Sequence, residues 1–86
     1  MHEDLEKLAG ELVSDFPGAT TEIEEYKESI MLNVRWNKKL FILAYVGSRW
    51  GVDMVRDGEG FDTGLRILAA DFAAGRADLL RLMRAP

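Results

Sequence analysis

Residues 29–56 read SIMLNVRWNKKLFILAYVGSRWGVDMVR, and this stretch decides the fold. Large apolar side chains stand at every second position over most of it, a period typical of half-buried β-strands. Extended to the preceding residues, the alternation predicts four strands: Thr20–Tyr26, Ser29–Trp36, Lys39–Val46 and Trp50–Arg56. The joints between them are so short that each predicts a tight antiparallel hairpin.

The three joints differ in turn chemistry. Gly47 and Ser48 suit a turn with glycine at its first central position, and Asn37 and Lys38 form a second two-residue joint. Lys27 and Glu28 are poor residues for such a turn, so this hairpin is also compatible with a longer loop.

The strand registers can be tested against one another. Two-residue turns place six pairs of apolar residues opposite each other, and all of them fall on one face of the sheet with Ile30 and Trp36. A slip of one residue would turn a whole strand over and destroy this agreement. The expected pairs are Tyr45 with Trp50, Leu43 with Val52, Phe41 with Met54, Val34 with Phe41, Leu32 with Leu43, and Ile23 with Leu32.

Helical periodicity flanks the strands on both sides. Apolar residues at three- and four-residue steps predict a helix over residues 3–15 and a second over residues 63–83, capped by Asp62 or Thr63. Arg76 lies beside Gly75 within the second apolar stripe, so either the helix breaks there or Arg76 lays its stem across the sheet. The chain is therefore predicted to be a single α+β domain over residues 1–86. We expect a two-layer α-β-β-β-β-α sandwich with both helices on one face of the sheet, and Trp36, Phe41, Tyr45, Trp50 and Phe72 in its core.

Groups that carry chemistry are scarce. The chain has no cysteine, and its one imidazole, His2, lies at the terminus. Gly58, Gly60 and Gly64 depart from the dinucleotide-binding spacing, and Phe61 stands where a calcium loop needs an oxygen ligand. We therefore predict no catalytic residue, cofactor or metal, and interpret residues 57–62 as a linking loop. An enzyme would have to use carboxylates alone.

Charge is unevenly distributed along the chain. The net charge is −4, but residues 1–28 hold nine acidic and two basic side chains, whereas residues 29–86 hold six and nine. Glu22, Glu24, Glu25 and Glu28 mark the first strand, which we expect at the sheet edge. Such charges either guard an edge strand against aggregation or form a docking strip for a basic partner.

The second sheet face is unusually apolar in its middle strand for a surface in contact with water, and we expect Arg35, Arg49 and Asp53 at its rim. Three explanations remain open: the second helix covers it, a second copy covers it in a homodimer, or a different protein binds there. The register places ten residues on this face: Met31, Asn33, Arg35, Leu40, Ile42, Ala44, Val46, Arg49, Asp53 and Val55. From this face and the acidic edge we select eight candidate partner-binding residues: Glu22, Glu24, Met31, Arg35, Leu40, Ile42, Val46 and Arg49.

These observations favour a small, non-catalytic protein-interaction module that binds itself or another protein, as immunity proteins, inhibitors and secretion chaperones do. The acidic start is unlike a signal peptide, and the longest apolar run, residues 40–46, is far shorter than the roughly 20 residues that span a bilayer. We therefore expect a cytoplasmic protein without membrane contact. The alternative is a nucleic-acid-binding domain, against which the negative net charge argues. It would use Arg35, Lys38, Lys39, Arg49, Arg56, Arg76, Arg81 and Arg84.

Overall fold

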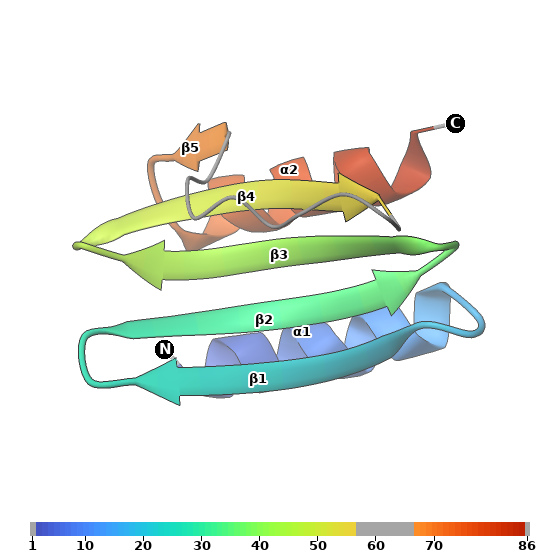
Figure 1. Ribbon diagram of the computed structural model, residues 1–86, viewed down its shortest axis with the longest axis horizontal. Helices are drawn as coiled ribbons and strands as arrows, with labels where there is room; N and C mark the ends of the chain where they lie inside the picture. Colours follow the sequence, from blue (N-terminus) through green and yellow to red (C-terminus); the bar gives the residue numbers. More distant parts are fainter. Residues whose placement is uncertain (1, 57–66, 86) are drawn as a thin grey trace.

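A five-stranded antiparallel sheet with two helices on one face forms the fold (Figure 1). The computed structural model describes residues 2–56 and 67–85. The α+β class and the single covered face are confirmed, but the count of four strands was one too few. In chain order the elements are α1 (His2–Asp15), β1 (Thr20–Tyr26), β2 (Ser29–Trp36), β3 (Lys39–Val46), β4 (Arg49–Arg56), β5 (Ile67–Ala69) and α2 (Phe72–Arg84).

Every predicted strand register is confirmed. Tyr45 lies opposite Trp50, Leu32 lies opposite Leu43, and the other four apolar pairs also match. The strands follow one another in space as they do in sequence, so the sheet is a simple meander. The alternation of apolar and polar residues specifies this register because one side of each strand is buried under the helices.

All three hairpins have two-residue turns. Lys27 and Glu28 need no longer loop, because Tyr26 already pairs with Ser29. Asn37 and Lys38 have φ angles of 53° and 62°, and Gly47 and Ser48 have 59° and 63°. Positive φ at both central residues is the signature of a type I′ turn, so both of these turns, including the one with glycine at its first central position, belong to this type.

The core lies between the covered face and the two helices. Leu5, Leu8 and Leu12 line the inner side of α1, and Leu79 and Met83 line that of α2. They meet a sheet face on which Leu32, Val34, Phe41, Leu43 and Val52 are almost fully buried. Trp50 packs between the rings of Tyr45 and Phe72, at centroid separations of 5.1 and 5.4 Å. Because both helices enter one core cluster, the explanation in which α2 covers the second sheet face was wrong.

The second helix starts later than its apolar periodicity suggested. Asp71 caps it, with its side-chain Oδ1 accepting a hydrogen bond from the backbone N–H of Ala74 at 2.8 Å. The predicted caps, Asp62 and Thr63, and the predicted loop over residues 57–62 lie outside the described residues. Leu68, which lies within the helix predicted over residues 63–83, is instead in β5, opposite Gly51 of β4. This strand supplies pairing partners for the backbone of β4, and that tertiary context outweighs a three-residue helical pattern.

Helix α2 continues through Gly75 without a break. Gly75 is buried against β3, and a Cβ atom at this position would lie 2.7 Å from Cδ1 of Leu43. The glycine therefore permits close approach of helix and sheet. Arg76, next to it, extends to the other helix, where its Nη2 lies 2.9 Å from Oε2 of Glu11.

Candidate partner-binding face

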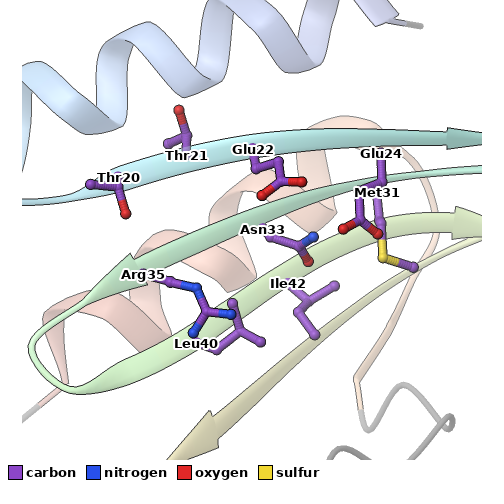
Figure 2. Close-up of a pocket in the computed structure, with 9 residues that line it drawn as sticks. All are labelled: Thr20, Thr21, Glu22, Glu24, Met31, Asn33, Arg35, Leu40 and Ile42. Carbon is purple, nitrogen blue, oxygen red and sulfur yellow. The ribbon is translucent and has the colours of Figure 1, made fainter.

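A shallow hollow of about 420 Å³ lies on the sheet face away from the helices (Figure 2). Six of the eight predicted partner-binding residues line it: Glu22, Glu24, Met31, Arg35, Leu40 and Ile42. Among the described residues, Thr20, Thr21 and Asn33 also line it. The two remaining predicted residues, Val46 and Arg49, do not line this hollow.

Cross-strand pairing explains why these side chains lie together. Glu22 on β1 lies opposite Asn33 on β2, which lies opposite Ile42 on β3. In the neighbouring row, Thr20 lies opposite Arg35, which lies opposite Leu40. Side chains opposite each other on one face have Cβ atoms about 5 Å apart, so each row forms a continuous strip. Both rows start with a polar residue at the sheet edge and end with an apolar residue near its centre.

The charged groups of the hollow lie mainly at its rim. Glu22 and Arg35 are exposed, and neither forms an ion pair with another residue in the described part of the chain. Glu24 is half-buried, and its Oε2 accepts a hydrogen bond from the hydroxyl of Tyr26 at 2.6 Å. That hydrogen bond, together with the negative charge of Glu24, raises the pKa of Tyr26. The rim thus offers negative charge on the β1 side and one positive charge at the end of β2.

The floor of the hollow is less open than the sequence suggested. Ile42 has only 2% of its surface exposed, and Ala44 is fully buried within the single chain. Met31 and Leu40 are half-buried and form the accessible apolar part of the floor. Asp53, which we expected at the polar rim, is also buried, and its Oδ1 accepts a hydrogen bond from the backbone N–H of Met54. That part of the prediction was therefore wrong.

Val46 and Arg49 lie at the other end of the same face, as a directly opposed pair beside the β3–β4 turn. Both are exposed. Leu68 is 63% exposed, and its pairing with Gly51 assigns it to the same face by the alternation of side chains along a strand. This third residue was not predicted from the sequence, because Leu68 also fits a helical apolar pattern and its strand was therefore missed.

The basic residues of the nucleic-acid alternative are divided between the two ends of the sheet and α2. Arg35 and Arg49 belong to opposite ends of the sheet, separated along β4 by six residues, or roughly 20 Å. Arg76 is paired with Glu11, and Arg81 with Asp78. The tryptophans are also unsuited to stacking on bases: Trp50 is buried, and the Nε1–H of Trp36 donates to the carbonyl of Pro17 at 3.1 Å.

His2 is held in an acidic setting at the start of α1. Its Nδ1 lies 2.5 Å from Oε1 of Glu25 on β1, and its Nε2 lies 2.9 Å from Oε1 of Glu6. The hydrogen bond to Glu25 and the two nearby carboxylates raise the pKa of His2. Across residues 2–56 and 67–85, no group of three or more His, Asp or Glu side chains is arranged to hold a metal ion.

Comparisons with known proteins give no information about the function of this chain. No protein-family model matches this chain, and the searches of curated proteins and solved structures found no match either. Within the described residues, neither helix has the length and apolar character needed to cross a bilayer.

Proposed function

We propose that this chain is a small, non-catalytic interaction module of the cytoplasm that binds another protein at the hollow formed by β1, β2 and β3. The hollow itself carries the proposal. It brings six of the eight independently selected residues together, with an apolar floor and charged groups at its rim. An apolar centre surrounded by polar groups is the usual organisation of a protein-binding surface.

A different protein is a better candidate partner than a second copy of this chain. A standard interface buries about 800 Å² on each partner, and homodimer interfaces are the more apolar class. Ile42 and Ala44, the central apolar residues of the face, are already buried within the single chain. Few apolar side chains of the described residues are therefore accessible on this face. Glu22 and Arg35 form no ion pair within residues 2–56 and 67–85, and their charges favour a partner with complementary charges.

The test compares a variant in the hollow with a matched variant elsewhere. Leu40→Lys places a charge in the half-buried floor, whereas Val13→Lys makes the same kind of change on α1, where Val13 is 48% exposed. Each immobilised protein is incubated with an extract of the source cells. A protein retained by the wild type and by Val13→Lys but lost with Leu40→Lys is then purified and titrated into the ¹⁵N-labelled chain.

The proposal expects chemical-shift changes centred on the lining of the hollow. It is refuted if no ligand depends on Leu40, or if the shift changes map to the helices. Sedimentation velocity tests the alternative of self-association. A dimer that Leu40→Lys dissociates would replace the partner protein with a second copy.

A further inference from the structure

The edge of the sheet formed by β1 has unused hydrogen-bonding capacity. In a two-residue hairpin the pair that flanks the loop exchanges backbone hydrogen bonds, and every second pair after it does the same. Here that flanking pair is Tyr26 and Ser29. The N–H and C=O groups of Thr21, Ile23 and Glu25 therefore point away from β2. β1 is the terminal strand of the sheet, and no described strand pairs with its outer side (Figure 1).

The side chains along this edge define what an additional strand would need. Glu22 and Glu24 lie on the face of the hollow, and Figure 2 shows both beside its apolar floor. Between them Ile23 is half-buried and packs against the core on the covered face. Residues of an added strand would lie about 5 Å from the residues opposite them. Basic side chains would therefore complement Glu22 and Glu24, and an apolar side chain between them would extend the contact of Ile23.

We propose that β1 binds an extended segment of its protein partner by strand addition, and that this segment alternates basic and apolar residues. The inference rests on the proposed function, since it names the chemistry of the partner that reaches the hollow. Main-chain hydrogen bonds to the open edge provide affinity, and the glutamates select for lysine or arginine at every second position.

A second copy of β1 does not meet these requirements. An antiparallel pairing of two β1 strands centred on Ile23 would place Glu22 of each copy opposite Glu24 of the other. Like charges directly opposite each other destabilise a strand pair. The same glutamates therefore discourage edge-to-edge pairing between copies, as charged edge strands do in general, while they attract a basic segment.

The probe for this proposal is a fluorescein-labelled, end-capped heptapeptide of sequence Lys-Val-Lys-Val-Lys-Val-Lys. Fluorescence anisotropy measures its binding at low ionic strength. One control peptide has the same side chains but carries an N-methyl group on every backbone amide, which removes the N–H donors of both edges without changing the charge. A second control replaces each lysine with glutamate. On the protein side, Glu22→Gln/Glu24→Gln is compared with Glu3→Gln/Asp4→Asn, which removes the same charge from exposed positions on α1.

The proposal expects the alternating peptide to bind and both control peptides to fail. The double glutamine variant at β1 is expected to bind roughly tenfold more weakly, from two lost cross-strand charge pairs, while the α1 control stays within about twofold. Amide hydrogen exchange gives a residue-level readout. On binding, exchange slows at Thr21, Ile23 and Glu25, whereas Glu22 and Glu24, already bonded to β2, change little.

Equal binding of the N-methylated peptide would overturn strand addition, because charge attraction alone would then explain the affinity. Absence of binding by the alternating peptide would overturn it as well. Neither result contradicts the capture of a partner that depends on Leu40, so the proposed function is compatible with both. Conversely, a peptide that protects Thr21, Ile23 and Glu25 supports the strand site even where no Leu40-dependent partner is found.

Discussion

Gly75 allows a sharp test of how closely α2 lies on the sheet. In the middle of a helix, replacement of glycine by alanine stabilises by about 1 kcal/mol through conformational preference alone. At Gly75 the added Cβ would lie 2.7 Å from Cδ1 of Leu43, which is fully buried and has little room to move. Overpacking a core typically costs about 1–3 kcal/mol. We therefore expect Gly75→Ala to destabilise the protein by about 1 kcal/mol.

A double-mutant cycle isolates the energetic cost of the steric clash between the new Cβ at position 75 and the side chain of Leu43. Leu43→Val shortens the side chain by one carbon, so that no methyl group remains at the δ position that the new Cβ would meet, and it costs about 1 kcal/mol by itself. In that background Gly75→Ala is expected to stabilise by about 1 kcal/mol, because only the helix preference remains. The sign reversal corresponds to a coupling energy of about 2 kcal/mol between the two positions.

Urea unfolding monitored by tryptophan fluorescence measures all four free energies, with CD as a second probe of two-state behaviour. Gly10→Ala in α1 is the matched control, because a Cβ there has no atom within 4 Å. It is expected to stabilise by about 1 kcal/mol. The argument from close approach is wrong if Gly75→Ala stabilises the protein as much as Gly10→Ala does. It is also wrong if Gly75→Ala changes the free energy of unfolding by the same amount whether leucine or valine occupies position 43.

Three further predictions concern the ends and the centre of the helices. Asp71→Ala removes the N-cap of α2 and should lower the free energy of unfolding by about 1 kcal/mol in urea titrations. Asp71→Asn should retain most of the stabilisation that the cap provides, because asparagine caps helices about as well as aspartate. His2, whose pKa is raised by its hydrogen bond to Glu25, should stabilise the fold below its ordinary pKa of 6.5 and lose this contribution as pH rises through the higher folded value. An NMR titration of His2 measures that value, and Glu25→Gln should lower it; an unchanged value would contradict the assignment. Leu79→Ala empties a fully buried position and should cost about 2–5 kcal/mol, seen as a large drop in the thermal midpoint.

The strands could be predicted from the sequence because two independent constraints agree on them. The period-two pattern divides each strand into two faces, and two-residue turns then allow only one register. In Leu32, Leu43 and Val52, for example, one row of apolar residues crosses three strands, so a slip would expose several large side chains together. No comparable constraint applied to Ile67–Ala69, whose three apolar residues fit a helix as well as a strand. Asp71, a favourable capping residue, was the signal that the helix starts later.

The sequence predicts which residues share the face of the candidate site, but not how far each side chain is buried there. Alternation along β1, β2 and β3 identifies which side chains share the second face, and the hollow contains most of those selected. The alternation predicts the face on which a side chain lies, but not how much of its surface stays exposed. The pattern therefore did not predict that the folded chain buries Ile42 and Asp53. The open hydrogen-bonding edge of β1, in contrast, follows directly from its position and turn length.

The meander has a consequence for how the chain folds during synthesis. Helix α1 contacts β1 and β2, whereas α2 contacts β3, β4 and β5, so each helix covers the strands nearest to it in sequence. The first half can therefore assemble while translation continues, but the apolar side of β3 and β4 has no cover until residues 72–84 have left the ribosome. During that interval Leu43 and Val52 are exposed to chaperones and to other nascent chains, and a stop codon ahead of α2 would make this vulnerable state permanent.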